Sequence, residues 1–189
     1  MKIVLATSNS HKVKEINLLV EDLDIEFVLP PDDFDPVEDG KSFEENSLIK
    51  AREAWKLSRN WVLADDSGLC IDSLNGAPGI HSARYADTPQ ARIDRVLTEM
   101  KSLKNRTARF KCAMTLINPD GEVAFSYLGV CEGSIITEQR GVNGFGYDPI
   151  FLVNGLNQTM AEVSEEMKNK ISHRGKALKK VLEYLATLQ

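Results

Sequence analysis

Two adjacent aspartates follow a short apolar run that is typical of a buried strand. The run is Trp61–Ala64, and Asp65 and Asp66 come directly after it. Open α/β sheets usually bind their ligands at the carboxyl ends of their strands. Hard carboxylate oxygens at such a place suit Mg²⁺, which takes one or two carboxylates together with substrate phosphate oxygens. The alternative is a plain turn after the strand.

A third acid, Glu45, could join this pair. It stands at the last position of Ser42–Glu45, which matches a capping box, so its carboxylate could equally serve only to close the start of a helix. Apolar residues at helical spacing follow it, and they predict a helix over residues 43–58.

A polar segment between a predicted strand and a predicted helix could bind an anion. The strand is Ile3–Ala6, and apolar residues at helical spacing begin at Val13. Free backbone N–H groups and the helix dipole favour a phosphate there, and Lys12 adds a mobile charge. An ordinary helix cap is the alternative. The segment has no glycine and is therefore neither a Walker A loop nor a dinucleotide fingerprint. It consists of Thr7, Ser8, Asn9, Ser10, His11 and Lys12.

Two further stretches carry groups that could hold a flat ligand. In Gly141–Pro149, three glycines let the backbone come close to a ring, Phe145 offers a stacking face, and Asp148 could accept a hydrogen bond from a ring or sugar. Residues 168–180 are basic and contain no acid, and Ser172, His173 and Arg174 stand at an expected helix start. A glycine-rich turn and an ordinary solvated helix face are the alternatives.

Composition and charge exclude several classes of protein. The chain has 189 residues, of which 42% are hydrophobic and 27% charged, which is ordinary for one globular domain. Its net charge of −5 does not suit a protein that binds nucleic acid. No apolar run approaches the length of a membrane span, and the apolar run at the N-terminus is shorter than the core of a signal peptide. We therefore expect a cytoplasmic location. The cysteines, Cys70, Cys112 and Cys131, lack metal-site spacing and are interpreted as buried thiols.

The remaining pattern predicts the elements that position these groups. A strand pair over residues 108–127 turns at Asn118–Gly121, and Pro89 begins a helix. Ser164 caps a short helix, residues 150–153 form a strand, and an amphipathic helix closes the chain. Residues 21–45 are rich in Asp and Glu and are expected to be mostly solvated surface. Together these elements predict a mixed sheet in an α/β (mixed α+β) fold.

Six motifs in this order resemble the inosine triphosphate pyrophosphatase family, also called the Ham1-like or non-standard purine nucleoside-triphosphate pyrophosphatases. The resemblance runs nearly end to end, and it implies a single domain over residues 1–189 with two lobes, an elongated mixed sheet and a nucleotide cleft between the lobes. One departure is Asp87, where the family pattern leads us to expect glycine. The motifs are Thr7–Lys12, Ser42–Asn46, Ala64–Leu69, Gly76–Tyr85, Gly144–Pro149 and Ser172–Gly175.

The resemblance also implies roles for individual residues. Asp66 would be the general base and would bind Mg²⁺ with Glu45, while Asp65 supports the metal site. The triphosphate would be held by Thr7, Ser8, Asn9, Ser10, His11 and Lys12 with Lys50 and Lys168. Ser67 would touch the substrate, the base and sugar would lie on Phe145, Gly146, Tyr147 and Asp148, and the purine edge would be read by Ser172, His173 and Arg174.

The implied activity is Mg²⁺-dependent hydrolysis of dITP, ITP and XTP to the monophosphate and pyrophosphate by a homodimer. The 6-keto group of these purines would accept hydrogen bonds from backbone N–H groups, His173 or Arg174, whereas the 6-amino group of adenine would set donor against donor. One rival is a Maf-type pyrophosphatase acting on modified pyrimidine nucleotides, against which the Ser172–Arg174 motif argues. A second is a non-catalytic nucleotide sensor, which would be expected to lack one of the acids. A third is an RNA-binding module, which the net charge disfavours.

Overall fold

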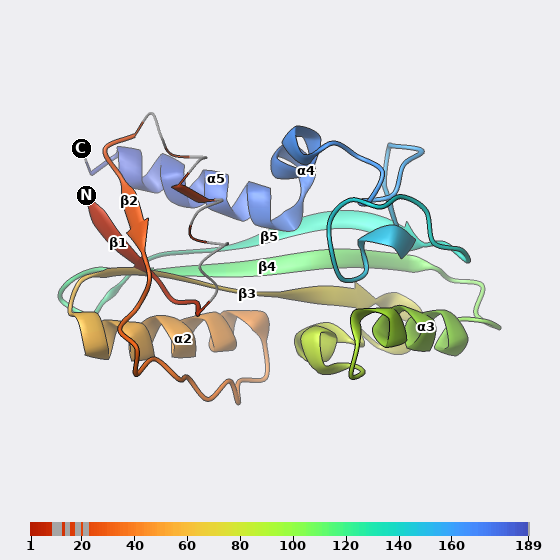
Figure 1. The fold of residues 1–189 in the computed structure, drawn as a ribbon, viewed down its shortest axis with the longest axis horizontal. Helices are drawn as coiled ribbons and strands as arrows, with labels where there is room; N and C mark the ends of the chain where they lie inside the picture. Colours follow the sequence, from red (N-terminus) through yellow and green to blue (C-terminus); the bar gives the residue numbers. More distant parts are fainter. Residues whose placement is uncertain (9–12, 14–15, 18–19, 21–22, 189) are drawn as a thin grey trace. The chain divides into compact units, whose positions relative to one another are not determined.

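A mixed sheet is the centre of the fold. The computed structural model describes residues 1–8, 13, 16–17, 20 and 23–188. Within these residues, six strands form one sheet in the order β2-β1-β3-β4-β5-β6 (Figure 1). β1 is parallel to both β2 and β3, whereas β6 is antiparallel to β5, so the predicted mixed α/β class is confirmed. The strands are β1 (Lys2–Leu5), β2 (Glu26–Val28), β3 (Trp61–Ile71), β4 (Thr107–Ile117), β5 (Val123–Ile135) and β6 (Phe151–Val153).

The chain divides into two compact units. Unit 1 consists of Met1–Asp66, Ala113–Tyr127 and Lys180–Gln189, and unit 2 consists of Ser67–Cys112 and Leu128–Lys179. The division therefore separates Asp66 from Ser67 in the middle of β3. The helices are α2 (Phe43–Ser58), α3 (Pro89–Glu99), α4 (Glu165–Ile171) and α5 (His173–Ala186).

In unit 1, α2 packs on the start of the sheet. Ala51 and Ala54 of α2 are fully buried and belong to one apolar cluster with Val62 and Ala64 of β3. Figure 1 shows α2 lying along this part of the sheet. The ends of α2 are fixed locally, because Ser42 Oγ accepts from the backbone N–H of its third residue and the chain leaves the helix through a left-handed residue. The helix predicted over residues 43–58 is thus confirmed with the same bounds.

β3 is longer than the apolar run Trp61–Ala64 predicts. It continues through Asp65 and Asp66 to Ile71, so the aspartates lie inside a strand and not at its end. Apolar residues on both sides of the polar stretch explain this, because Val62 is buried in the core of unit 1 and Ile71 in the core of unit 2. The strand is anchored at both ends, and the polar residues between are held extended.

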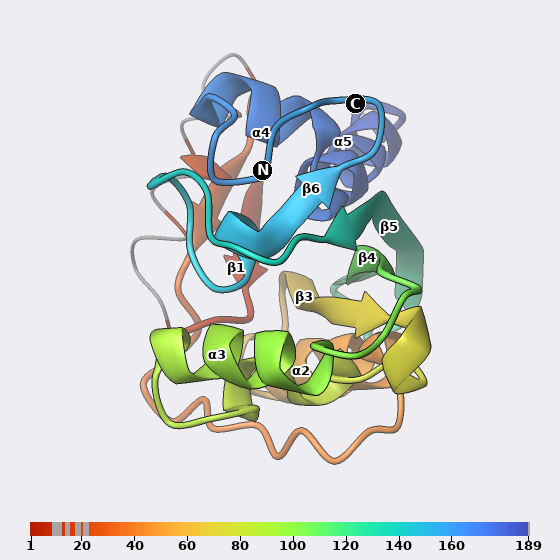
Figure 2. The same cartoon turned by 90° about the vertical axis from the view of Figure 1, so that its right-hand side faces the viewer.

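Unit 2 has its own core between the sheet and α3. Ile93 and Val96 of α3 pack in one cluster with Leu69 of β3 and Phe110 of β4. Figure 2 shows α3 beside this part of the sheet and β6 next to β5. Thr88 Oγ1 accepts from the third residue of α3 at 3.1 Å, which confirms the predicted helix start.

β4 and β5 form the predicted hairpin. Asn118 N donates to Glu122 O at 3.0 Å at the turn, and Ile135 N donates to Arg106 O at 2.9 Å at the far end, so the two strands are antiparallel. Gly121 in the turn has a φ of 88°, which only glycine adopts readily.

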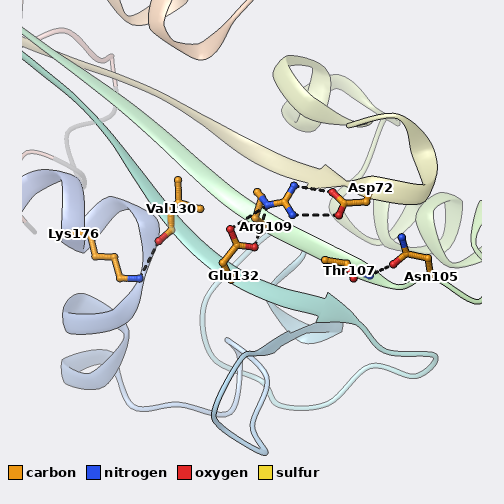
Figure 3. Close-up of polar contacts among 7 residues, drawn as sticks. All are labelled: Asp72, Asn105, Thr107, Arg109, Val130, Glu132 and Lys176. Atoms are coloured by element: carbon orange, nitrogen blue, oxygen red, sulfur yellow. Dashed lines mark hydrogen bonds and ion pairs between the residues drawn. The ribbon is translucent and has the colours of Figure 1, made fainter.

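An ion-pair network ties a short 3-10 turn (Asp72–Leu74) to this hairpin (Figure 3). Arg109 of β4 donates to both carboxylate oxygens of Asp72, at 2.7 and 3.2 Å, and its Nε lies 3.0 Å from Glu132 Oε2 of β5. These carboxylates hold the pKa of the Arg109 guanidinium above its ordinary value. Because Asp72 directly follows β3, the network fixes the end of that strand to β4 and β5.

The three cysteines are free and buried, as the sequence predicts. Burial raises the pKa of the Cys70 and Cys131 thiols, which makes them poor nucleophiles. In the described part of the chain, no helix has the length and apolarity that a membrane crossing requires.

Candidate active site

Unit 1 brings a lysine against two carboxylates. Lys50 of α2 lies with its Nζ 3.4 Å from Asp66 Oδ1 of β3 and 3.1 Å from Glu38 Oε2, which comes from the segment before α2. The Lys50 and Asp66 side chains are only 13% and 15% exposed. An ammonium and two carboxylates therefore meet where water screens their charges poorly.

Asp66 is short of partners for a buried carboxylate. Burial raises the pKa of its carboxyl above the ordinary value, although Lys50 and a hydrogen bond from Asn46 act in the opposite direction. Among the described residues, no group donates a hydrogen bond to Asp66 Oδ2, which is covered from solvent. This oxygen is suited to take a proton or a cation, because either would relieve a charge that the protein compensates incompletely.

Lys50 keeps its charge firmly. Burial disfavours the ammonium, but the negative charges of the two β3 aspartates and of Glu38 together outweigh it and raise the pKa of Lys50. The group is therefore a permanent cation at the position where the resemblance implies a phosphate contact.

Glu45 lies at the start of α2, where its carboxylate has a capping role. Its Oε2 accepts from Lys41 N at 2.7 Å, and its own N donates to Ser42 Oγ at 3.1 Å. Its implied role as a metal ligand stays a prediction, and the alternative that the capping pattern offered is present. Asp65 is buried in β3, and its charge acts on Lys50.

The carboxylates of this group suit a hard divalent ion, although the described residues do not form a complete set of ligands. No set of three His, Cys, Asp or Glu side chains is arranged to hold a metal in the part of the chain that the structure describes. Mg²⁺ does not need such a set, since it keeps several waters and takes one or two carboxylates. The covered and incompletely compensated Asp66 Oδ2 is the observation in favour of such an ion.

The segment predicted to bind an anion begins directly after β1. Thr7 and Ser8 are described, and Thr7 N donates to Leu5 O at 2.7 Å directly after β1. The remaining predicted residues, Asn9, Ser10, His11 and Lys12, lie outside the described residues.

Unit 2 assembles a second group of the predicted residues around an aromatic ring. Phe145 is 66% exposed, with Lys168 Nζ 4.6 Å and the Arg174 guanidinium carbon 5.8 Å from its ring centroid. Arg174 Nη2 donates to Ser67 Oγ at 3.1 Å. An exposed ring beside two cations is a suitable platform for a flat, electron-rich ligand with acceptor groups.

Asp148 supports this platform through two hydrogen bonds. Its Oδ2 accepts from Phe145 N at 2.9 Å and from Lys168 Nζ at 2.5 Å, and the residue is 4% exposed. Gly144 makes the close approach possible, because a Cβ there would lie 2.1 Å from Asp148 Oδ2. The structure therefore joins Lys168 to Asp148 and Phe145 in unit 2, whereas Lys50 contacts acids of unit 1.

The other predicted residues of unit 2 take supporting positions. Tyr147 is buried and its hydroxyl donates to Ser82 O at 2.8 Å, so its ring lies in the core. Ser172 Oγ accepts from Gly175 N at 3.0 Å in the first turn of α5. His173 is buried and stacks on Phe110 at 4.9 Å between ring centroids. Gly146 has a φ of 60° and contributes only backbone. Substrate contacts of these residues stay predictions.

Two residues of unit 1 are missed by sequence reasoning. Glu38 falls in the acidic stretch interpreted as solvated surface, yet it pairs with Lys50, so that interpretation is wrong at this position. Asn46 is 1% exposed, accepts from Gly40 N at 2.8 Å and acts on Asp66. Asn46 is the last residue of the motif Ser42–Asn46, although no role was predicted for it, and Glu38 had no signal that set it apart from its acidic neighbours.

The chain is similar to known proteins over nearly its whole length. A model of the Ham1 family matches residues 3–184. A dITP/XTP pyrophosphatase of Nostoc sp. is 42% identical over 186 residues, with 98% of this chain and 95% of that protein covered. A dITP/XTP pyrophosphatase of Treponema denticola is 45% identical over 194 residues, with 98% of each chain covered.

Solved structures agree with these relatives. The Ham1 protein of Staphylococcus aureus has a TM-score of 0.92 with 37% identity, and all of both chains is covered. A HAM1 protein of Coxiella burnetii has a TM-score of 0.92 with 44% identity, and 99% of each chain is covered. The match to the family model includes both the residues around Lys50 and those around Phe145, and the relatives cover nearly the whole chain. This chain therefore belongs to the Ham1 family.

Proposed function

We propose that the protein is a Mg²⁺-dependent pyrophosphatase that hydrolyses dITP, ITP, XTP and dXTP to the nucleoside monophosphate and pyrophosphate. The observation that carries this proposal is the Asp66 carboxylate, which has one covered oxygen without a hydrogen-bond donor and the Lys50 ammonium 3.4 Å from the other. A base and a cation side by side are what hydrolysis of a phosphoanhydride needs. The similar proteins named dITP/XTP pyrophosphatase support the same reaction.

Asp66 takes the proton of the attacking water in this proposal. Water adds to the α-phosphorus, the bond from that phosphorus to the bridging oxygen breaks, and the leaving oxygen remains on pyrophosphate. A carboxyl whose pKa is raised by burial is a stronger base than an ordinary aspartate. Lys50 compensates negative charge on the phosphate oxygens, and Mg²⁺ when bound supplies further charge neutralisation there. No covalent intermediate with the enzyme is required.

The unit 2 group selects the base. The Phe145 ring stacks on the purine, and Arg174 donates to the 6-keto oxygen of hypoxanthine or xanthine. The guanidinium is already oriented by its bond to Ser67 Oγ at 3.1 Å, so part of its ordering cost is met before the substrate arrives. Adenine presents a 6-amino donor to the same group and leaves both unpaired, which costs about 1–3 kcal/mol for each buried donor.

A single domain over residues 1–189 with two lobes and one nucleotide cleft, as the family resemblance implies, is part of this proposal. The connection between the groups supports this, since Asp66 and Ser67 are consecutive residues of β3. The triphosphate lies with Lys50 and Asp66, and the base lies with Phe145 and Arg174.

A homodimer in the cytoplasm completes the proposal. Free buried cysteines are typical of a reducing compartment. The dimer rests on the family resemblance, and sedimentation equilibrium of the purified chain tests it. A mass of twice 21.1 kDa is expected.

The deciding experiment is pyrophosphate release with Mg²⁺ from dITP, XTP, dGTP, dATP and dUTP, with orthophosphate followed in parallel. We expect rapid pyrophosphate release from dITP and XTP only. Release from dUTP instead would favour the Maf-type alternative, and tight dITP binding without turnover would favour the sensor. Orthophosphate as the first product would contradict the site of cleavage.

A further inference from the structure

The side chain of the first residue of α5 packs on the ring of a phenylalanine in β4. His173 is buried, and its imidazole stacks on Phe110 with 4.9 Å between the ring centroids and 14° between the ring planes. Phe110 also contacts Phe151, with 4.4 Å between the centroids, and both phenylalanines belong to the core of unit 2. Phe110 therefore joins the start of α5 to that core.

The backbone of the same histidine lies directly against β5. A Cβ at Gly129 would stand 2.1 Å from the carbonyl oxygen of His173 and 3.0 Å from the backbone N of Ala177. A residue with a side chain cannot occupy this position unless the helix moves, because real Cβ atoms do not approach other heavy atoms so closely. Within the same part of α5, Lys176 Nζ donates to Val130 O at 2.9 Å (Figure 3). β5 thus holds the first turns of α5 by close backbone contact and by a hydrogen bond.

This support of α5 matters because Arg174 directly follows His173. The Arg174 guanidinium donates to Ser67 Oγ at 3.1 Å, and its central carbon lies 5.8 Å from the ring centroid of Phe145. If the start of the helix shifted, the guanidinium would shift with it. A misplacement of about 1 Å is enough to impair a directional contact with a ligand.

We propose that Phe110 and Gly129 are positioning residues for base selection: they fix the start of α5 against β4 and β5 and thereby place Arg174. The inference deepens the proposed function and rests on it for the identity of the base. A guanidinium that is already in place loses less conformational entropy when a 6-keto purine binds. Adenine gains nothing from this placement, because its 6-position offers Arg174 no acceptor. Loss of the support therefore weakens the use of dITP more than that of dATP.

Two pairs of variants separate positioning from a general loss of stability. Phe110→Leu removes the ring that stacks on His173, and its control, Phe151→Leu, removes the other ring that Phe110 contacts. Gly129→Ala places a methyl group against the carbonyl oxygen of His173. Its control is Gly133→Ala, a second buried glycine of β5, whose added methyl group would stand 2.4 Å from a backbone oxygen of β6.

Thermal unfolding and steady-state kinetics with dITP and dATP are measured for the wild type and all four variants. We expect all four to unfold at a lower temperature, because each disturbs a buried contact of unit 2. Phe110→Leu and Gly129→Ala should lower kcat/KM for dITP about 5- to 50-fold, mainly through KM, and that for dATP less than about threefold. Both controls should keep the ratio of the two values within about twofold of the wild type.

The stack itself has a spectroscopic signature that does not depend on turnover. The chain has three histidines, so the ring protons of His173 can be assigned by NMR in protein labelled with ¹³C-histidine. The Phe110 ring current displaces these signals in the wild type. The displacement should disappear in Phe110→Leu and persist in Phe151→Leu.

Two results would overturn the inference. An unchanged ratio of dITP to dATP in Phe110→Leu, with the His173 signals displaced from their wild-type positions, would show that the stack does not serve base selection. An equal fall of that ratio in Phe110→Leu and Phe151→Leu would assign the effect to a loosened core. If Gly129→Ala does not fold, the two phenylalanine variants still decide. Failure of the proposed function is separate, since it appears as absent dITP turnover in the wild type.

Discussion

Arg174 Nη2 donates to Ser67 Oγ at 3.1 Å, which fixes a guanidinium of α5 against the residue that directly follows Asp66 in β3. The proposed base reader is thereby attached to the strand that carries the proposed catalytic carboxylate. The Arg174 guanidinium also lies 5.8 Å from the Phe145 ring centroid, so one side chain contacts both the strand and the stacking platform.

Arg174→Ala is expected to damage base selection more than chemistry. Loss of one hydrogen bond from a charged donor should reduce kcat/KM for dITP about 10- to 100-fold. The rate with dATP should change less than about threefold, because Arg174 offers that base no favourable contact. Steady-state kinetics with both nucleotides measure this. Lys179→Ala, an exposed basic residue of the same helix, is the control, and equal losses with dITP and dATP would refute the base-reading role.

Asp66→Asn is expected to abolish turnover without loss of stability. Removal of a general base typically costs about 10²- to 10⁴-fold in rate. Because burial raises the pKa of Asp66, the folded state disfavours its charge, and a neutral amide of the same shape should leave the melting temperature equal or slightly higher. Lys50 keeps Glu38 as a partner in this variant. Pyrophosphate release and thermal unfolding are the two measurements, and near-native activity would remove Asp66 from the mechanism.

Local sequence signals predict the helices of this protein better than its strands. α2 and α3 begin where Ser42 and Thr88 predict, because a cap is a contact between residues three positions apart. The extent of β3 depends on two apolar cores formed by distant parts of the chain, so the run that ends at Ala64 underestimates the strand.

The same distinction applies to the site. The motif around Phe145 predicts a platform, but which neighbours face outward depends on the turn geometry, and Tyr147 points into the core. Glu38 is one of many acids in its segment, and only the fold shows that it pairs with Lys50. Residue types thus indicate the chemistry, while the pairing of side chains requires the three-dimensional structure.

Asp148→Asn is expected to weaken both the fold and the platform. Asp148 is 4% exposed, and its Oδ2 lies 2.5 Å from Lys168 Nζ. The substitution removes the negative charge that pairs with Lys168, although the amide oxygen can still accept from Phe145 N. Loss of one partner of a buried pair costs about 3–5 kcal/mol, and because Lys168 reaches solvent in part we expect about 2 kcal/mol here. The KM for dITP should rise as Lys168 and Phe145 lose their common anchor.

Glu166→Gln is the matched control for that variant. It breaks the ion pair of Glu166 with Lys170, whose side chains are 81% and 66% exposed, and such pairs contribute little. Urea unfolding of both variants gives the comparison. An Asp148→Asn variant as stable as Glu166→Gln would show that the buried pair is not needed for the fold.

Tyr147→Phe is expected to change the sign of its effect with pH. Burial raises the pKa of Tyr147 to about 12, whereas an unfolded tyrosine titrates near ~10. Below pH ~10 both states are protonated, and the variant should be less stable by about 1 kcal/mol because it lacks the hydrogen bond to Ser82 O.

Between pH ~10 and ~12 the unfolded wild type ionises while the folded state does not, which costs the wild type roughly 2–3 kcal/mol of stability. The variant has no such loss, so the stability curves from urea unfolding should cross near pH ~11. Parallel curves up to pH ~11.5 would show that the Tyr147 hydroxyl ionises as easily in the fold as in the unfolded chain.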